Sequence, residues 1–490
     1  MRSRKNNIFA IIFLFVFVFC GCQKGPDTKI ITSKNDGIFD SNAIQSADET
    51  HSDGETQEAK FDEVFYSTDG SVEYLMNVNE VLNNSNMPVI EVKPHYLSEA
   101  DAQRVATALF GDVEFFEAYP LLDPVYSKEE IQEKLIRWTP YTNQDAVDAL
   151  YGEHKASAVD VVKSFISEYT ELYDAAPDKA QKVPCEWEFK KIPFYQMPKS
   201  EAAALDNSKE TDSIQATLKK NNLPYRYIVE TRDQADYKAN YVTAYIYDGI
   251  SPYFIDDRIF FSQLCRTDKP DETSVNNIKK QAEDMLKQME LGDWEIDECY
   301  VDTVYYGENI EYTVNLRAVP VFNGIEAIRQ PQPSELTSDN TYAANYALTD
   351  VSFCFSPNGN LLNFVMYSPV DIEKVLNENV AVIEIQELVK KAENTLSYSD
   401  YYNYDPGFLI DSAEEGLRCT VNICDIEYNL NRTRVPDTEA GYYYVPCLTL
   451  LGSVEFSGKE SNTVYYSSET PITLVSINAV DGSVINATNQ

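Results

Sequence analysis

Two proline-containing motifs and two turn glycines indicate that the C-terminal half of this 490-residue chain uses one structural plan twice. Val319-Pro320 and Val445-Pro446 are 126 residues apart, and Gly359 and Gly482 are 123 residues apart. Two markers at nearly the same offset predict a repeat with a period near 125 residues, longer than that of solenoid repeats. Because proline cannot donate to a strand ladder, we expect each Val-Pro to lie on a sheet edge or at a bulge.

Each copy begins with an amphipathic helix, at about 274–289 and at about 384–396. Apolar residues recur there at three- and four-residue steps, the spacing of one helix face. The residues expected on the buried faces are Ile278, Ala282, Met285 and Met289 in the first copy and Ile385, Leu388, Ala392 and Leu396 in the second. Strands follow, of which Glu311–Arg317 alternates apolar and polar side chains. One helix on an antiparallel sheet of about four strands is an α+β layer.

The order of these elements resembles PepSY-like domains, and the resemblance rests on the runs Val319–Gly324 and Val445–Leu448 and on the two turns. It is also similar to the paired domains of the YycH/YycI regulators, membrane-tethered extracytoplasmic proteins of Gram-positive bacteria. The resemblance covers roughly residues 274–486. It implies sensing or modulation of a partner protein, not a known reaction.

Two helix starts are predicted in the N-terminal half by capping boxes. Ser98 is followed three residues later by Asp101, and Ser127 is followed at the same spacing by Glu130. A serine at the N-cap accepts from a free backbone N–H, while the acidic side chain accepts from the N-cap backbone. Gly111 is placed to end the first of these helices.

A third helix is expected over about 156–173, with Leu172 on its inward face, and strands are expected from Arg226 to Leu264. Asp248-Gly249 is a hairpin signal within those strands. The predicted fold class is therefore α+β, with a helical-plus-strand N-terminal piece followed by two helix-on-antiparallel-sheet repeats. The expected divisions are a signal peptide (1–21), a flexible tether (22–60), an N-terminal α+β domain (61–270), a first α+β repeat (271–372) and a second (373–490).

The first 22 residues combine three basic residues, the apolar run Ile8–Phe19 and then Cys20-Gly21-Cys22. A basic segment, a short apolar run and a small residue are the marks of a secretory signal. A helix of about 12 apolar residues spans only about 18 Å, less than the ~30 Å hydrocarbon core of a membrane. A transmembrane anchor is therefore the weaker alternative.

The segment Phe19–Cys22 resembles a lipobox, the site where bacteria attach diacylglycerol to a cysteine and cleave before it. Gly21 fits the small residue before the cut and Cys22 fits the acceptor, whereas Phe19 departs from the usual leucine. The resemblance implies a lipid on Cys22 that holds the protein on the outer face of the cell membrane. The whole chain is similar to an uncharacterised family of lipoproteins of gut Firmicutes.

The tether and the net charge both favour presentation above the membrane. Residues 23–60 are mostly polar and cannot bury enough apolar surface to offset their ordering entropy. The formal charge is -39, and removal of the three basic residues of the signal leaves about -42. Such a surface repels nucleic-acid backbones, so we expect no nucleic-acid partner. Anionic solubility is the simplest reason for the charge, and attraction of cations or of a basic partner is the alternative.

Side chains that carry most catalysis are scarce. The three histidines are His51 in the tether, His95 before the first predicted helix and His154 before the third, and we expect all of them on the surface. No His-x-x-x-His pair, nucleophile elbow or glycine-rich phosphate loop occurs in the sequence. The acidic pairs Glu414-Glu415 and Asp256-Asp257 are expected in solvated turns. No catalytic residue, metal ligand or cofactor is predicted.

Seven cysteines remain after Cys22, and none forms a Cys-x-x-Cys pair. We expect most of them to be small buried hydrophobes, with a bridge between Cys424 and Cys447 as the alternative. The leading hypothesis is a non-enzymatic, lipid-anchored protein that binds or restrains a protein partner. One alternative is a small-ligand or glycan-binding lipoprotein of a transport or surface complex, with a Tyr/Phe-lined cleft between the N-terminal piece and the repeats. Another is a hydrolase that uses two carboxylates. The oligomeric state stays open.

Overall fold

The structure is a computed structural model that describes residues 56–118, 126–152, 156–180, 182–193, 210–234, 237–246, 255–306, 309–328, 349–398, 417–434, 442–458, 464–467 and 471–487. Over these ranges the architecture is α+β with more strand than helix, so the expected class is confirmed. The chain separates into two compact units. The small unit comprises Met1–Ser85, Val380–Tyr428 and Pro446–Gln490, and the large unit comprises Asn86–Asn379 and Asn429–Val445.

The large unit contains a ten-stranded antiparallel sheet. Its strands are β4 (Phe116–Glu117), β5 (Lys190–Pro193), β6 (Glu210–Lys220), β7 (Leu223–Gln234), β8 (Tyr237–Ile246), β9 (Trp294–Tyr306), β10 (Asn309–Phe322), β11 (Ile325–Glu326), β12 (Asp350–Phe355) and β13 (Leu361–Tyr367). The order is β11-β10-β12-β13-β8-β7-β6-β4, with β9 beside β10 and β5 beside β6.

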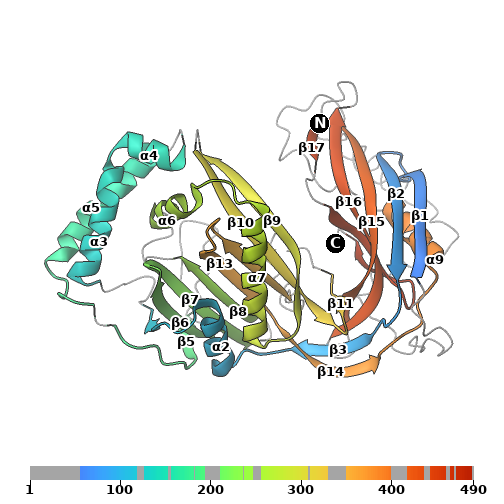
Figure 1. The fold of residues 1–490 in the computed structure, drawn as a ribbon, viewed down its shortest axis with the longest axis horizontal. Helices are drawn as coiled ribbons and strands as arrows, with labels where there is room; N and C mark the ends of the chain where they lie inside the picture. The colour runs from blue at the N-terminus through green and yellow to red at the C-terminus, as the bar shows by residue number, and fades with distance from the viewer. Residues whose placement is uncertain are drawn as a thin grey trace, which may run out of the picture. The chain divides into compact units, whose positions relative to one another are not determined.

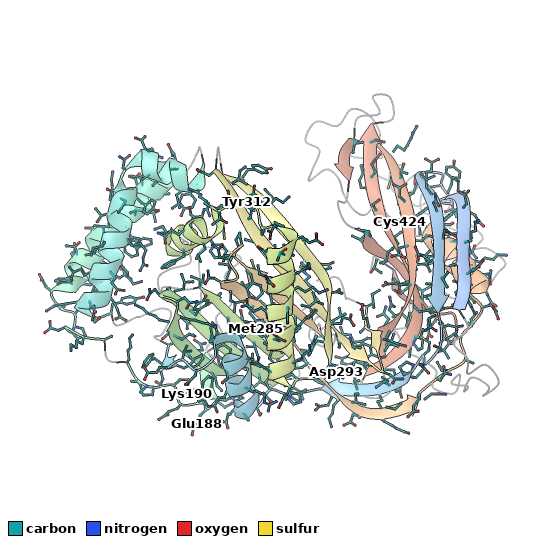
Figure 2. The ribbon with its side chains drawn as sticks, viewed as in Figure 1. Glu188, Lys190, Met285, Asp293, Tyr312 and Cys424 are labelled. Carbon is teal, nitrogen blue, oxygen red and sulfur yellow. The ribbon has the colours of Figure 1, made fainter. Side chains whose placement is uncertain are left out.

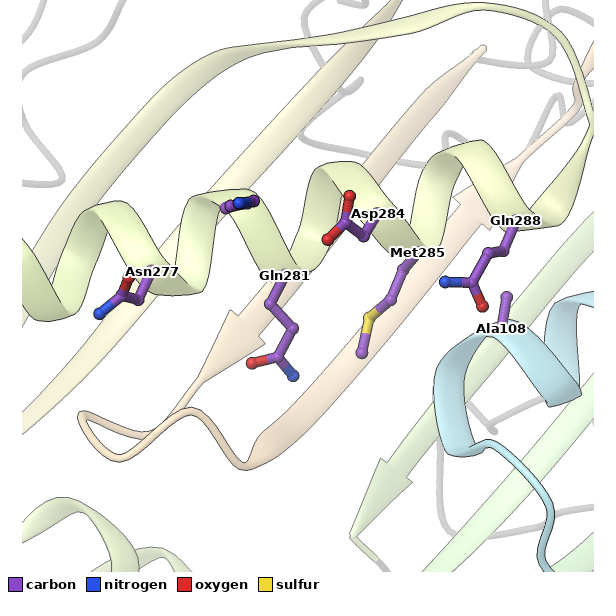
Figure 3. Close-up of a pocket in the computed structure, with 7 residues that line it drawn as sticks. Ala108, Asn277, Gln281, Asp284, Met285 and Gln288 are labelled. Atoms are coloured by element: carbon purple, nitrogen blue, oxygen red, sulfur yellow. The ribbon is translucent and has the colours of Figure 1, made fainter.

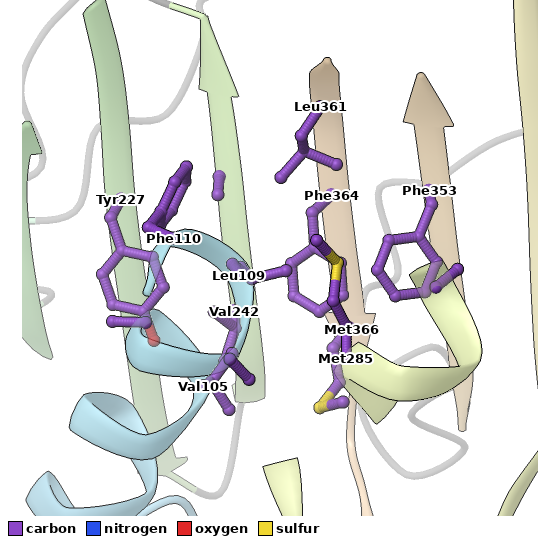
Figure 4. Packing of buried hydrophobic residues seen from close by; sticks show 14 of the residues in the cluster. Val105, Leu109, Phe110, Tyr227, Val242, Met285, Phe353, Leu361, Phe364 and Met366 are labelled. Atoms are coloured by element: carbon purple, nitrogen blue, oxygen red, sulfur yellow. The ribbon is translucent and has the colours of Figure 1, made fainter. Parts of the chain in front are cut away.

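Two helices, α2 (Glu99–Phe110) and α7 (Glu272–Met289), lie over one face of this sheet (Figure 1). The expected apolar face of α7 is buried in full and packs with phenylalanines of the central strands (Figure 4). The hydroxyl of Tyr227 donates to the Ala102 carbonyl at 2.7 Å, so the buried ring keeps its polar group satisfied. This layer is the main core of the large unit.

Four helices and a helical turn form a separate cluster in the large unit. They are α3 (Lys128–Trp138), η3 (Thr139–Thr142), α4 (Gln144–Tyr151), α5 (Ala156–Tyr173) and α6 (Ile255–Cys265). The buried Glu311 on β10 accepts from Arg258 and Arg266, and both guanidinium groups also donate to the Leu150 carbonyl at the end of α4. These bonds fasten the cluster to the sheet. None of the helices in the described ranges is both long and apolar enough to cross a membrane.

The small unit consists of one helix packed on a mixed sheet. The elements are β1 (Thr56–Tyr66), β2 (Val72–Asn83), α9 (Ile385–Tyr398), β15 (Leu417–Arg434) as far as Tyr428, β16 (Tyr442–Gly458) from Pro446 onward, β17 (Val464–Ser467), β18 (Ile472–Asn478) and β19 (Val484–Ala487). The order is β1-β2-β15-β16-β18-β19, and β2 is parallel to β15. The predicted buried face of α9 is confirmed, and the hydroxyl of Tyr74 donates to the Leu396 carbonyl at 2.9 Å.

A two-stranded ribbon completes the large unit. It pairs β3 (Val89–Pro94) with β14 (Val370–Asn377) in antiparallel fashion, and β3 also pairs with residues 442–444 of β16. The inner strand β3 is largely buried, whereas residues 371–375 of β14 are all exposed. Residues 371–375 therefore owe little of their position to apolar burial.

The local helix signals are confirmed in detail. Ser98 and Ser127 each form a complete capping box, and Gly111 ends α2 with a positive φ of 74°. The third helix spans 156–173 as expected, but Leu172 is 47% exposed and the expected inward position is wrong. Leu172 lies in the last turn of α5, beyond the ring contacts that Trp138 makes with Phe165 and Tyr169.

Two boundaries differ from the expectation. Residues 56–60 belong to β1, with Ala59 fully buried, so the tether cannot extend to residue 60. The expected strands over 226–264 end with β8, because the next described element is α6, and the Asp248-Gly249 turn lies outside the described residues. Tyr241–Tyr245 of β8 pair with Asn363–Tyr367 of β13, which takes the side where a hairpin partner would lie.

The units also differ from three successive domains (61–270, 271–372, 373–490). Pairing of β8 with β13 joins the first two of these into one sheet, and pairing of β2 with β15 joins the chain start to the last. The observed boundary at Asn379–Val380 lies close to the expected one at 372, but both units are discontinuous in sequence. Long-range strand pairing is the physical reason, because hydrogen bonds between strand edges join segments that are far apart in the chain.

Both prolines of the Val-Pro motifs lie where a long strand changes its neighbour. Pro320 falls between Ala318, which pairs with β12, and Val321, which pairs with β11. Pro446 falls between Tyr444, which pairs with β3, and Cys447, which pairs with β18. A missing donor is tolerated at such a change.

The two prolines are nevertheless not equivalent positions. Val314 pairs with the end of β12, and Cys447 pairs with the end of β18. Pro320 therefore comes six residues after Val314, whereas Pro446 comes one residue before Cys447. The match between the two Val-Pro motifs is wrong by about seven residues.

Candidate functional site: a histidine between two carboxylates

Of the three histidines, His95 is the one that lies within the described residues. Two carboxylates contact its ring, one from six residues away and one from 276 residues away. His95 follows β3, Asp101 lies in the first turn of α2, and Asp371 lies near the start of β14. The antiparallel register places Asp371 opposite Lys93, two residues before the histidine. The capping box of α2 therefore supplies one carboxylate to the imidazole, and the pairing of β3 with β14 supplies the other.

The backbone around His95 is held by a buried asparagine of β8. The Asn240 side chain donates to the His95 carbonyl at 2.5 Å and accepts from the Leu97 N–H at 3.1 Å. The Asn240 carbonyl accepts from the Ser368 N–H at 2.7 Å, and the His95 N–H donates to the Pro369 carbonyl at 2.8 Å. These bonds fasten the end of β3 and the start of β14, which lie side by side at one end of the ribbon, to the large sheet.

Both ring nitrogens of His95 face carboxylate oxygens. Nδ1 lies 2.9 Å from Asp371 Oδ1, and Nε2 lies 3.1 Å from Asp101 Oδ2. An ionised carboxylate only accepts, so two such contacts require a proton on each nitrogen and favour the imidazolium. Burial disfavours that charge, but the hydrogen bonds and charges of Asp371 and Asp101 outweigh it and raise the pKa of His95.

Asp101 is held by more polar contacts than Asp371. Its Oδ2 accepts from the Ser98 N–H at 2.9 Å and from the Ser98 hydroxyl at 2.6 Å, and Arg104 lies 3.3 Å from its Oδ1. Burial alone would raise the pKa of Asp101, but the bonds from Ser98 and His95 lower it. Asp371, by contrast, is 48% exposed.

The order of contacts decides what this cluster can do. In a hydrolytic triad the histidine lies between serine and acid, where it accepts the serine proton. Here Asp101 lies between Ser98 and His95, and the Ser98 hydroxyl donates to the carboxylate. His95 therefore has no path to activate Ser98. The arrangement holds a proton between β14 and α2, and it is not organised for nucleophilic attack.

The other sequence-predicted positions mostly fall elsewhere. Cys22, Gly21, His51, His154 and Glu414-Glu415 lie outside the described residues. The pair Asp256-Asp257 lies in the first turn of α6 and not in an irregular turn. His95 was expected on the surface, and it is partly buried with 27% of its side chain exposed.

All seven cysteines after Cys22 are free thiols, so the alternative bridge between Cys424 and Cys447 is wrong. Strand register is the reason. Cys424 on β15 (Figure 2) approaches the Leu451 carbonyl, four residues beyond Cys447. Burial raises the pKa of Cys265 and Cys419 to about 12, so these thiols stay protonated.

A polar groove of about 320 Å³ runs along α7 beside α2 (Figure 3). It lies between the N-terminal piece and the first predicted repeat, where an aromatic cleft was expected. Its lining is instead mostly amide and charged, comprising Ala108, Asn277, Lys280, Gln281, Asp284, Met285 and Gln288. In the described part of the chain, no three His, Cys, Asp or Glu side chains are grouped as a metal site requires.

Of the two carboxylates that contact His95, only one could be recognised from the neighbouring sequence. Asp101 was visible as the third residue of a capping box six positions after the histidine. Asp371 is 276 residues from His95, and nothing in the local sequence links the two. The strand pairing that joins them is a long-range property of the fold.

No protein-family model matches the chain, and no curated protein matches it. Among solved structures, the chain is similar to an uncharacterized protein from Eubacterium rectale ATCC 33656, determined by crystallography at 1.45 Å resolution. The two chains are 12% identical, and the match covers 84% of this chain and 91% of the other, with a TM-score of 0.37.

Proposed function

We propose that this chain is a lipid-anchored extracytoplasmic protein whose two α+β repeats bind or restrain a protein partner. The observation that carries the proposal is the matching strand order of two layers. In the large unit β9, β10, β12 and β13 are neighbours in that order, with α7 before them in the chain. In the small unit β15, β16, β18 and β19 have the same order, with α9 before them.

The turn glycines support the repeat independently of strand order. Gly359 and Gly482 both have positive φ, at 77° and 74°. A Cβ built on Gly359 would lie 3.3 Å from Gln281 of α7, and one built on Gly482 would lie 2.8 Å from Lys391 of α9. Each glycine thus lies in the turn of the last hairpin of its layer. At that turn the hairpin approaches the helix that comes first in the layer, α7 or α9.

Exposed apolar side chains offer a surface for a partner. Val64 and Tyr66 on the outer side of β1 are 57% and 54% exposed, and Leu75 of β2 is paired opposite Val64. Apolar side chains gathered on one exposed sheet face are typical of protein-binding surfaces. The acidic charge of the whole chain favours a partner with a basic surface.

Anchoring is tested by replacing the acceptor cysteine in the native host. Cys22→Ser should leave an uncleaved precursor without lipid, because only a thiol at that position can receive the diacylglycerol. Cys20→Ser is the matched control and should remain cleaved and membrane-bound. Mass spectrometry of the N-terminus and membrane fractionation measure both. An unmodified wild-type N-terminus, or lipidation that persists in Cys22→Ser, would contradict the anchor.

Binding is tested by placing a photo-crosslinking residue at Tyr66 in the anchored protein, with Ile136 on α3 as an exposed control. A single protein should crosslink at Tyr66 and not at Ile136. If crosslinking from both sites and pull-down from crosslinked membranes recover no specific protein, the proposal fails.

A second function, binding of a small polar ligand or glycan, is favoured by the amide-rich groove on α7. Amide side chains both donate and accept, which suits hydroxyl-rich ligands. A thermal-shift screen of sugars and peptides should then show stabilisation that Gln288→Ala removes. A screen without such a ligand would discard this second function.

A further inference from the structure

We propose that protonation of His95 is a latch that holds the start of β14 to α2, and that loss of the proton releases Asp371. This inference rests on the geometry of the large unit and does not depend on the proposed function. The imidazole links the exposed strand β14 to the helix α2 through side chains. Asp371 belongs to β14, and Asp101 belongs to α2.

The charged side chains around the imidazole lie on three elements, α2, β3 and β14. Asp371 and Asp101 face its two nitrogens, and Arg104 of α2 lies 3.3 Å from Asp101 on the far side. Lys93 of β3 pairs with Glu373 of β14 and raises the positive potential near Asp371. The two carboxylates in direct contact therefore dominate the environment of the ring.

Loss of one proton from the imidazolium does not weaken the contacts with Asp101 and Asp371 equally. A neutral imidazole has one N–H, so one of the carboxylates must then face a lone pair. Asp101 keeps its bonds from Ser98 and its contact with Arg104 in that state. Asp371 is half exposed and can turn to water or to Lys93. The bond to Asp371 is therefore the one that breaks.

The sign of the pH dependence follows from the direction of the shift. The pKa of folded His95 is raised above its usual 6.5, so the unfolded chain loses this proton first as pH rises. The latch contributes its full stabilisation below about pH 6.5 and loses it as pH passes the folded pKa. The start of β14 thus has this additional side-chain bond to His95 under acidic to neutral conditions and loses it under alkaline ones, while its backbone pairing with β3 stays.

The test uses the mature full-length chain, with the histidine signals followed by NMR and the β14 amides by hydrogen exchange. His95→Gln assigns the imidazole signal. In the wild type, His95 should titrate above pH 6.5, and protection of residues 370–377 should fall through the same range after correction for intrinsic exchange. The change should be about tenfold for each unit by which the pKa is raised.

Two variants of β14 separate the latch from general effects of charge. Asp371→Asn should lower the His95 pKa and remove the pH dependence of β14 protection. Glu373→Gln removes a neighbouring carboxylate that pairs with Lys93, and it should leave both close to wild type. Titration of wild-type His95 at or below pH 6.5 would overturn the proposal. So would equal pH dependence of β14 protection in Asp371→Asn and wild type.

Discussion

The carboxylates of Asp101 and Asp350 are both buried, but their surroundings drive their pKa values in opposite directions. Asp101 accepts three hydrogen bonds from Ser98 and His95, and its pKa falls. Asp350 opens β12 with 5% of its surface exposed, and its Oδ1 has no hydrogen-bond partner. Burial raises the pKa of Asp350 to about 6, although Arg317 partly opposes the shift.

Asp350→Asn should stabilise the protein at neutral pH. The folded pKa of about 6 lies above the unfolded value of 3.8, so ionised Asp350 opposes folding above pH 6 and the penalty fades as pH falls. The shift corresponds to about 3 kcal/mol, so we expect a gain on the order of 1–3 kcal/mol at pH 7.5 that is roughly halved at pH 5. Thermal unfolding at both pH values measures this, with Asp293→Asn as the exposed control. A gain independent of pH would contradict the explanation.

Strand packing in the small unit depends on one glycine of β16. A Cβ built on Gly452 would lie 2.3 Å from the Asn422 carbonyl of β15 and 2.7 Å from Leu474 of β18. The first clash is with backbone, so a side-chain rotation cannot relieve it. The neighbouring strand can approach this closely only because Gly452 lacks a Cβ.

Gly452→Ala should therefore destabilise the fold by about 3 kcal/mol or more, in the upper range of overpacked cores. Gly70→Ala is the matched control, since its Cβ would meet nothing within 4 Å and only its φ of 73° opposes the change. That strain costs about 1–2 kcal/mol. Urea unfolding compares the two variants. Equal losses would show that the contact with Asn422 is relieved by backbone movement.

At the scale of the whole molecule, the small unit needs the start of the chain. Its core joins Tyr74, Met76 and Val78 of β2 to α9 and to β15. The parallel β2–β15 pairing links Val72 with Cys419, positions nearly 350 residues apart. A fragment that begins after β2 therefore lacks one wall of this core.

The fragment 373–490 should fail to fold alone, because it leaves the edge of β15 unpaired and removes the apolar side chains of β2 from the core. We expect poor amide dispersion in its NMR spectrum and no cooperative thermal transition. A second polypeptide that joins residues 56–85 to 380–490 supplies the missing strands and should regain dispersion. A well-dispersed spectrum from 373–490 alone would contradict this division of the chain.

Local signals predicted the helices far better than the sheets. The boxes at Ser98 and Ser127 and the apolar faces of α7 and α9 are confirmed, because a helix is stabilised by bonds and contacts within four residues. The strand expected after β8 and the equivalence of the two Val-Pro motifs depended on strand neighbours. Those neighbours are chosen by the fold, so a short sequence pattern does not identify them.

The amino-acid order was sufficient for the α+β class, the helix starts and the buried helix faces, and it carries the lipobox-like segment at Cys22. Which strands become neighbours, how the two units divide the chain and which carboxylates flank His95 depended on contacts between residues up to hundreds of positions apart. Helical periodicity and capping act over a few residues and are written in consecutive side chains. The Asp371–His95 contact spans 276 residues, and it exists because β3 and β14 are paired in the folded protein.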